Sequence, residues 1–282
     1  FLFSSMPAFL SRTTWTNLIF SSGNNFLKSQ NIIGLYDIDT RALTRIIREY
    51  GVMNARIASS ADDSEAVCEL QKKHKIKDAV LSVSCDKILE NTNEGKLYRV
   101  VLWDFGFKES IRRELEKRGC AVTVVPAGTA AEQISAMKPD GVLLSSGPDD
   151  PSANTGIIRE LRKLCETKVP LFGICLGHLL LALSQGAKSS KMKYGHHGAN
   201  QPVKELATGR VYITSQNHGY AVVGDTLPQN AVMSYINAND GTAEGIDYKD
   251  MPAFSVQFQP GAGPLDTVFL FDRFINLMKE GR

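Results

Sequence analysis

The stretch VPLFGICLGHLLLAL, residues 169–183, decides how the second half of this chain folds. Its first part is a short apolar run that predicts a buried strand, and its second part is long and apolar enough for a buried helix. Between them lies GICLG, residues 173–177, a cysteine with a glycine two positions to either side. A tight strand-to-helix turn needs small flanking residues, so the pattern is the cysteine counterpart of the G-x-S-x-G nucleophile elbow. We therefore predict that Cys175 is a nucleophile.

The helix after the cysteine would also activate the thiol, because N–H groups in the first turn of a helix favour a thiolate and lower its pKa. The alternative is a buried structural cysteine in a strand–helix turn, and the paired glycines favour the nucleophile. The segment SSGPDDP, residues 145–151, follows the preceding apolar strand. Its turn can direct backbone amides toward the same crevice as an oxyanion hole, although the same residues suit an ordinary turn that caps the next helix.

Apolar strands alternate with helices on both sides of this stretch. We predict strands at 98–106, 120–128, 141–148 and 169–175 and helices at 108–119, 130–141, 153–166 and 176–187. Short strands should follow at 211–214, 234–238, 244–247 and 253–258, and then a helix at 265–279. Near-continuous apolar strands in this alternation indicate an α/β fold with a doubly wound, mostly parallel sheet. Function gathers at the carboxyl ends of the strands in such sheets.

The first third of the chain has a different pattern. An apolar run at 32–40 predicts a buried strand, followed by a helix with Asp39 or Thr40 as its N-cap. That helix shows apolar residues at helical spacing and a stop signal, namely Leu43, Ile46, Ile47, Tyr50 and Gly51. Further predictions are a strand at 52–59, a polar helix at 62–76 and a linker at 88–96. We divide the chain into residues 1–94, a small domain with its linker, and 95–282, the α/β domain.

Composition limits the partners of the chain. The 282 residues carry a net charge of +2, which gives no electrostatic case for nucleic acid or an anionic membrane. Five cysteines without a C-x-x-C pair favour free thiols in a reducing compartment and no zinc site. Residues 1–20 are apolar, but they lack a basic start and are interrupted by Pro7 and Arg12, so we expect neither a signal peptide nor a membrane anchor. These features favour a cytoplasmic protein.

The order of motifs resembles the class I glutamine amidotransferase domain of the small subunit of carbamoyl-phosphate synthetase. The segments that carry the resemblance are VVLWDFGFKESIRRELEKRGC, DGVLLSSGPDDP, VPLFGICLGHLLLAL, MKYGHHGANQPV, YITSQNHGYAV and AFSVQFQP. Upstream, IIGLYDIDTRALTRIIREYGVMNARI is similar to the end of the same subunit's N-terminal domain. The resemblance covers residues 21–282. It implies a flavodoxin-like sheet preceded by a truncated, smaller α+β domain.

The resemblance implies a reaction as well. Glutamine would be hydrolysed to glutamate and ammonia through a thioester on Cys175. The ammonia would pass to a large subunit that uses ATP and Mg²⁺, so this chain itself would need no cofactor and no metal. The resemblance places the oxyanion and glutamine contacts at Gly147 and Leu176 and a substrate-holding loop at Asn217, Gly219 and Tyr220. The product of the complex would serve arginine or pyrimidine biosynthesis.

Two positions depart from the family's catalytic pattern. The family has an H-P-E run after the last core strand, in which the histidine is the general base and the glutamate orients it. This chain has Gln259 and Gly261 there. An amide cannot accept and return a proton at neutral pH, and loss of a positioned base costs about 10²–10⁴-fold in rate. The resemblance thus implies an impaired glutaminase or a non-catalytic relative that binds, stabilises or regulates the large subunit. His218 is the candidate substitute base.

Three further residues of the implied pocket differ from the family. Asp149 replaces a glycine of the G-P-G-D-P turn, Leu179 replaces a glutamine that contacts the substrate, and Ser146 replaces an asparagine. A carboxylate at position 149 would repel a developing oxyanion by about 4 kcal/mol at ~4 Å and an effective dielectric near 20. Among the other histidines, we expect His178 to pack against the sheet and His196 and His197 to lie in a structural turn.

Overall fold

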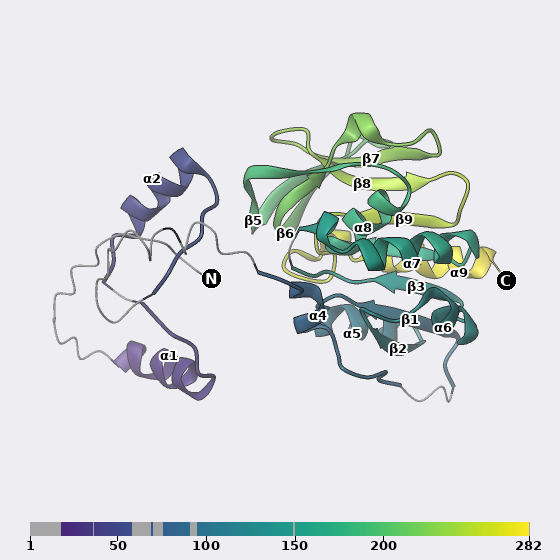
Figure 1. Ribbon diagram of the computed structural model, residues 1–282, viewed down its shortest axis with the longest axis horizontal. Helices are drawn as coiled ribbons and strands as arrows, with labels where there is room; N and C mark the ends of the chain where they lie inside the picture. Colours follow the sequence, from purple (N-terminus) through teal and green to yellow (C-terminus); the bar gives the residue numbers. More distant parts are fainter. Residues whose placement is uncertain are drawn as a thin grey trace. The chain divides into compact units, whose positions relative to one another are not determined.

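The computed structural model describes residues 18–35, 37–57, 69, 76–90, 95–148 and 150–281. Contacts divide the chain into two compact units, Phe1–Lys75 and Ile76–Arg282 (Figure 1). Asp149, nearly all of the polar helix predicted at 62–76 and most of the apolar segment at 1–20 lie outside the described residues. Among the described helices, none has the length and apolar character needed to cross a bilayer.

The larger unit is built on one sheet with the strand order β2-β1-β3-β4-β9-β8-β6-β5-β7. The first five strands of this order run parallel, and β8 pairs with β9 in the antiparallel direction. The strands are β1 (Tyr98–Asp104), β2 (Cys120–Pro126), β3 (Gly141–Leu144), β4 (Leu171–Ile174), β5 (Ser189–Glu205), β6 (Val211–Val222), β7 (Ala231–Asn237), β8 (Ala243–Tyr248) and β9 (Ala253–Val256).

Helices cover both faces of the parallel part of the sheet. They are α4 (Ala79–Val83), α5 (Glu109–Lys117), α6 (Ala131–Ala136), α7 (Thr155–Glu166), α8 (Leu176–Ser184) and α9 (Phe269–Glu280), with short 3₁₀ turns at Pro151–Ala153, Gly224–Thr226 and Leu265–Thr267. Val101 and Trp103 of β1 pack in one core with α6, α7 and α8. Val100 and Leu102 of the same strand pack in a second core with α5 and α9. The alternation of side chains along each strand therefore supplies both cores.

The predicted order of strands and helices from Tyr98 to α8 is confirmed, and so is the closing helix. Of the long antiparallel pair β5 and β6, only residues 211–214 of β6 were predicted as a strand. Most of β5 is exposed or half-buried, so it lacks the apolar periodicity that marks a strand in a sequence. Part of the linker predicted at 88–96 contacts the sheet: Leu89 forms an isolated bridge with Val124 of β2.

The smaller unit contains α1 (Leu18–Ser29) and α2 (Thr40–Tyr50). The predicted helix at 40–50 is confirmed, with Asp39 as its N-cap: the Asp39 carboxylate accepts a hydrogen bond from the backbone N–H of Ala42 at 2.8 Å. The strands predicted at 32–40 and 52–59 are wrong for the described residues of those runs, which are not extended into a sheet. Ile33 is 73% exposed. An apolar run becomes a strand only where a neighbouring strand takes up its backbone hydrogen bonds.

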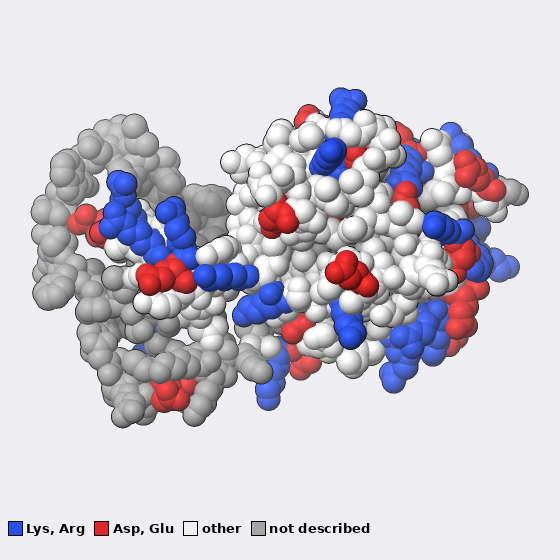
Figure 2. Space-filling model, turned by 90° about the horizontal axis from the view of Figure 1, so that it is seen from above, with Lys and Arg blue, Asp and Glu red and all other residues white. Residues whose placement is uncertain are grey.

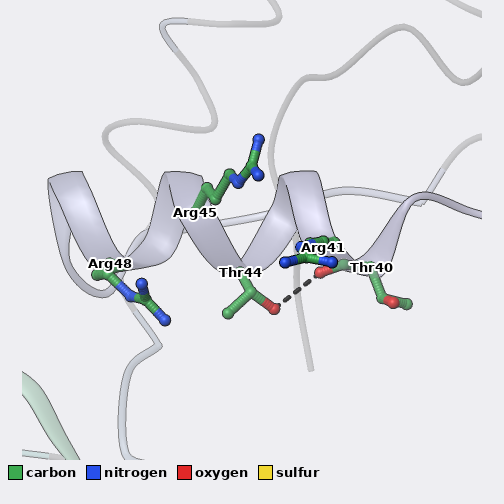
Figure 3. Close-up of a pocket in the computed structure, with 5 residues that line it drawn as sticks. All are labelled: Thr40, Arg41, Thr44, Arg45 and Arg48. Atoms are coloured by element: carbon green, nitrogen blue, oxygen red, sulfur yellow. Dashed lines mark hydrogen bonds between the residues drawn. The ribbon is translucent and has the colours of Figure 1, made fainter.

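Helix α2 presents a basic face. Arg41, Arg45 and Arg48 line a shallow hollow together with Thr40 and Thr44 (Figure 3). The Thr44 hydroxyl donates a hydrogen bond to the Thr40 carbonyl at 2.7 Å, and none of the residues in α2 is buried. On the larger unit, by contrast, Lys and Arg are mixed with Asp and Glu in the view of Figure 2. Exposed arginines of this kind suit a solvated face or an acidic partner surface.

We expect Gly177→Ala to destabilise the larger unit. A Cβ at this position would lie 2.4 Å from the Leu144 carbonyl oxygen, so α8 would have to move away from β3. The expected loss is about 1–3 kcal/mol of unfolding free energy, measured by urea titration with far-ultraviolet circular dichroism. Gly156→Ala in α7 is the matched control, because a Cβ there meets nothing within 4 Å. Equal stability of the two variants would contradict the close approach of α8 to β3.

Candidate functional site

Cys175 occupies the turn between β4 and α8 in an unusual backbone conformation, with φ 56° and ψ −104°. A residue with a side chain adopts such angles only where its surroundings enforce them, at a cost of about 1–3 kcal/mol. Two backbone hydrogen bonds hold the turn. The Cys175 N–H donates to the Val256 carbonyl at 2.8 Å, and the Gly177 N–H donates to the Ser145 carbonyl at 3.0 Å. This is the strained strand–turn–helix geometry of a nucleophile elbow.

The glycines of the site are required by close backbone packing. A Cβ at Gly173 would lie 2.9 Å from the carbonyl oxygen of Gly177. A Cβ at Gly147 would lie 2.2 Å from the Phe105 carbonyl oxygen and 2.7 Å from Leu176 Cδ2. The turn that contains Gly147 therefore packs directly against the first residue of α8. The structure brings together the two positions, Gly147 and Leu176, that we expected to form the oxyanion hole.

The thiol of Cys175 is buried at the edge of the core that includes α5 and α9, beside glutamine side chains. Cys175 is 4% exposed, and Gln257 Nε2 donates a hydrogen bond to its Sγ at 3.8 Å. Burial raises the pKa of the Cys175 thiol to about 11, even though the Leu176 backbone N–H and the Lys108 charge act to lower it. A thiol with this pKa is protonated at neutral pH. The N–H at the start of the helix thus lowers the thiol pKa as the sequence suggested, but burial raises that pKa by more.

Gln259 and Gly261 follow β9. Gln259 is buried, and a hydrogen bond from its side chain acts to lower the pKa of Cys175, which places the amide beside the thiol. The Gln259 backbone N–H donates to the Ser215 carbonyl of β6 at 2.9 Å. A Cβ at Gly261 would meet the Phe271 ring and Ser110 Oγ only at ordinary contact distance, 3.7 Å. Position 261 therefore has room for a Cβ atom.

His218, the candidate substitute base, lies in the middle of β6 and is buried. Its Nδ1 lies 2.9 Å from the carbonyl oxygen of Tyr220, and its Nε2 lies 3.1 Å from Gln216 Oε1. Burial lowers the pKa of His218 to about 4. Both ring nitrogens thus face polar groups of its own strand, and the structure shows no direct hydrogen bond from this ring to Cys175 among the described residues.

The other predicted substrate contacts lie on β6 and α8. Asn217 is exposed, and its Oδ1 lies 2.7 Å from His197 Nδ1. Gly219 and Tyr220 are half-buried, and Tyr220 packs against the core that includes α8. Leu179 is buried in that same core, where it contributes apolar packing in place of the amide expected for the family.

The remaining histidines differ in their surroundings. His178 is fully buried, and its Nδ1 lies 2.8 Å from Ser255 Oγ of β9, so the predicted packing against the sheet is confirmed. The turn predicted at His196 and His197 is wrong, because both lie in β5 and pair with His218 and Asn217 of β6. The flanking glycines, which suggested a turn, instead accompany shifts in the strand register, as at β-bulges.

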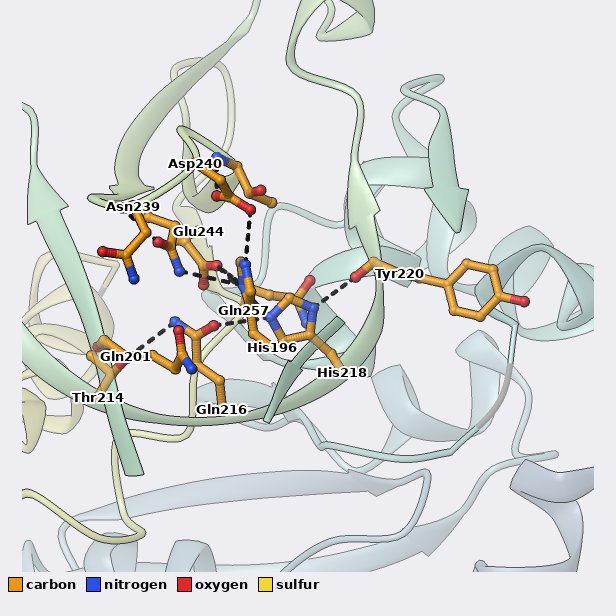
Figure 4. Close-up of polar contacts among 12 residues, drawn as sticks. His196, Gln201, Thr214, Gln216, His218, Tyr220, Asn239, Asp240, Glu244 and Gln257 are labelled. Carbon is orange, nitrogen blue, oxygen red and sulfur yellow. Dashed lines mark hydrogen bonds and ion pairs between the residues drawn. The ribbon is translucent and has the colours of Figure 1, made fainter. Parts of the chain in front are cut away.

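A polar cluster that the sequence reasoning missed lies on the antiparallel side of the sheet (Figure 4). Glu244 Oε1 lies 3.1 Å from His196 Nδ1 and 3.8 Å from His218 Nε2. His196 Nε2 in turn lies 3.0 Å from Asp240 Oδ2. These residues are far apart in the sequence, and Glu244 sits in a short apolar strand pattern, so the pairing of β5, β6 and β8 was needed to reveal them.

Comparison with known proteins gives consistent matches along the chain. The family model for glutamine amidotransferase class-I matches residues 101–277, and that for the CPSase domain of the carbamoyl-phosphate synthase small chain matches residues 12–57. The carbamoyl phosphate synthase small chain of Lactococcus lactis subsp. lactis (strain IL1403) is 46% identical over 260 residues, 91% of this chain and 72% of the relative. That of Listeria monocytogenes serovar 1/2a (strain EGD-e) is 48% identical over 270 residues, 94% of this chain and 73% of the relative.

A solved structure supports the fold. The crystal structure of a protein described as part of a GMP synthase, from Thermoplasma acidophilum, matches with a TM-score of 0.59 at 21% identity, over 66% of this chain and 96% of that chain. At this identity the match concerns the α/β fold alone. The family models and the curated relatives carry the assignment: this chain belongs to the carbamoyl phosphate synthase small chain family, with a class I glutamine amidotransferase domain.

Proposed function

We propose that this chain is the glutamine-hydrolysing subunit of a carbamoyl-phosphate synthetase and that its glutaminase rate is far below that of its relatives. The family assignment supports glutamine as the substrate, and it supports as the partner a large subunit that depends on ATP. The elbow geometry of Cys175 supports the thiol as the nucleophile. The proposal of a reduced rate rests on one observation, namely that the side chain beside the thiol is the amide of Gln259.

In the proposed reaction, the Cys175 sulfur attacks the carboxamide carbon of glutamine. The backbone N–H of Leu176 and the turn at Gly147 would stabilise the negative charge that develops on the carbonyl oxygen. Collapse of the tetrahedral intermediate breaks the C–N bond, releases ammonia and leaves a thioester. Water then attacks the thioester, which yields glutamate and restores the thiol. A base must take the thiol proton and return it to the leaving nitrogen.

Gln259 cannot perform this proton transfer, because a carboxamide has no accessible protonation step near neutral pH. With a pKa of about 11, the thiol is almost entirely protonated at pH 7.5. The reaction would then depend on this small thiolate fraction and on water as the proton carrier. We assign a low glutaminase rate to the chain on that basis.

The raised pKa of the Cys175 thiol and the lack of a base at Gln259 also favour a second function. With an unactivated thiol in an intact fold, the chain can act as a non-catalytic pseudo-amidotransferase that binds, stabilises or regulates the large subunit. The exposed arginines of α2 offer one surface of suitable chemistry for an acidic partner face. The two functions differ in one measurable quantity, the release of glutamate from glutamine.

We also infer that the chain shares the fold details and the compartment of its family. The strand order β2-β1-β3-β4-β9 matches the 2-1-3-4-5 order of flavodoxin-like sheets. The smaller unit would correspond to part of the family's N-terminal domain. The chain would work in the cytoplasm without a catalytic cofactor of its own, and ATP and Mg²⁺ would bind to the large subunit.

We expect the Cys175 thiol to titrate far above neutral pH, because burial disfavours its charged form. The measurement is the thiolate absorbance at about 240 nm, taken as the difference between the native chain and Cys175→Ser. The subtraction removes the signals of tyrosines and of the other cysteines. A midpoint above about pH 9 is expected. A midpoint below about pH 8 would show an activated nucleophile and contradict the proposed cause of the low rate.

Glutamate release from glutamine, measured with a large subunit present, should be about 10²–10⁴-fold slower than for the Lactococcus lactis relative. The double variant Gln259→His, Gly261→Glu should recover at least about tenfold, because it restores a base beside the thiol and a Cβ at position 261 meets its neighbours only at ordinary contact distance. Adding Asp149→Gly tests whether that carboxylate also opposes the reaction.

Cys175→Ser in the restored background is the control, and it should abolish the recovered rate. A native rate within about tenfold of the relative would disprove the impairment. No recovery in the double or triple variant, with large-subunit binding intact, would instead favour the non-catalytic function.

A further inference from the structure

Three strands bring two histidines and a glutamate together in a buried cluster, which we call the His–Glu cluster: His196, His218 and Glu244. His196 of β5 and His218 of β6 are direct register partners across an antiparallel pair, with ring centroids 4.9 Å apart. Glu244 lies at the start of β8, and its carboxylate points between the two rings (Figure 4). All three residues are buried.

The atoms that face one another in the cluster are imidazole nitrogens and carboxylate oxygens, which are common metal ligands. One ligand atom from each residue lies within 4.8 Å of the others. Glu244 Oε1 is 3.1 Å from His196 Nδ1 and 3.8 Å from His218 Nε2. Zinc binds imidazole nitrogen and carboxylate oxygen at ~2.0–2.2 Å, which places neighbouring ligand atoms ~3–3.5 Å apart. Side-chain shifts of less than about an ångström would therefore bring all three atoms to bonding distance of one ion.

The opposite nitrogen of each ring has the partner that metal-binding histidines require. A ligating imidazole donates its other N–H to a carboxylate or a backbone carbonyl, which fixes the tautomer and the ring orientation. His196 Nε2 lies 3.0 Å from Asp240 Oδ2. His218 Nδ1 lies 2.9 Å from the Tyr220 carbonyl oxygen. Both rings are thus oriented with the remaining nitrogen toward Glu244.

The burial of the Glu244 carboxylate is a second, independent reason to expect a cation in the cluster. It is 0% exposed, and its Oε2 is a buried atom without a hydrogen-bond partner in the described part of the chain. A buried carboxylate is costly unless it is paired or coordinates a cation. A protonated His196 would offset the charge at Oε1, but it would leave Oε2 unsatisfied. A divalent ion that binds the carboxylate would satisfy both the charge and the second oxygen.

We propose that the His–Glu cluster binds one divalent transition-metal ion of the zinc class through His196 Nδ1, His218 Nε2 and the Glu244 carboxylate. Two nitrogens and a carboxylate suit Zn²⁺, whereas Mg²⁺ and Ca²⁺ prefer oxygen ligands alone. Gln216 Oε1 lies 3.1 Å from His218 Nε2, which is the spacing of neighbouring ligand atoms, so this oxygen is available as a fourth ligand. Asn237 Nδ2, 3.4 Å from His196 Nδ1, must give way.

The ion would cross-link β5, β6 and β8. Because His218 lies between Asn217 and Gly219, the ion would also fix the part of β6 that we expect to hold the substrate. Metal binding at the His–Glu cluster can be measured without any assay of glutamine hydrolysis, so its failure and a failure of the proposed function are distinguishable. The cysteine spacing that argued against zinc in the sequence has no bearing on a site built from histidine and glutamate.

The test uses the full chain, freed of metal by chelation and titrated with Zn²⁺ in a calorimeter and with Co²⁺ in a spectrophotometer. We expect one ion per chain. Cobalt should give visible d–d absorption without the near-ultraviolet charge-transfer bands of thiolate ligands. Glu244→Gln, which keeps the shape and removes the charge, should weaken zinc binding at least tenfold, by analogy with the ~10–100-fold losses on removal of supporting residues. His218→Gln should weaken binding in the same way.

His197→Gln is the matched control, because this histidine neighbours His196 on β5 but directs its ring nitrogens to Asn217 and the Tyr194 carbonyl. It should leave zinc affinity unchanged. If Glu244→Gln fails to fold by circular dichroism, Asp240→Asn carries the test, since Asp240 is partly exposed and its substitution should reduce affinity about 10–100-fold. Absence of stoichiometric binding, thiolate charge-transfer bands with Co²⁺, or equal loss in His197→Gln would each overturn the proposal.

Discussion

The close approach of helix α8 to strands β3 and β4 is the constraint on which the rest of the site depends. Gly173 and Gly177 allow backbone to meet backbone, and this contact holds Cys175 at positive φ. The hydrogen bonds to Ser145 and Val256 then tie the elbow to the strands on either side. Because the strain is stored in the turn and balanced by these contacts, the nucleophile position is a property of the scaffold rather than of the cysteine side chain.

Geometry and acid–base chemistry are separable in this site. Close backbone packing and backbone hydrogen bonds hold the elbow, the Gly147 turn and the start of α8 together. Neither contact supplies a base: the amide of Gln259 neighbours the thiol, and His178 and His218 contact other polar groups. Preorganised backbone donors contribute to catalysis without a base, but they cannot remove a proton from a sulfur that burial keeps neutral.

The sequence predicted the parts of the fold that local physics determines. The helix at 40–50 follows from its cap and its apolar spacing, and the parallel core follows from apolar strands that alternate with helices. The elbow at Cys175 was evident because only glycines permit that packing. The strands at 32–40 and 52–59 were wrong because an apolar run without a pairing strand stays irregular. The His–Glu cluster escaped notice because its members meet only after β5, β6 and β8 pair, and no local pattern encodes that register.

The protonated state of Cys175 has a consequence for the chemical lifetime of the chain. Peroxide attacks the thiolate, and exposed cysteines of low pKa are converted to sulfenic acid and then to irreversible products. A buried sulfur that remains a thiol is a poor target for such oxidants. Burial thus protects the sulfur, and the chain should keep this cysteine reduced under oxidative conditions that inactivate thiolate enzymes.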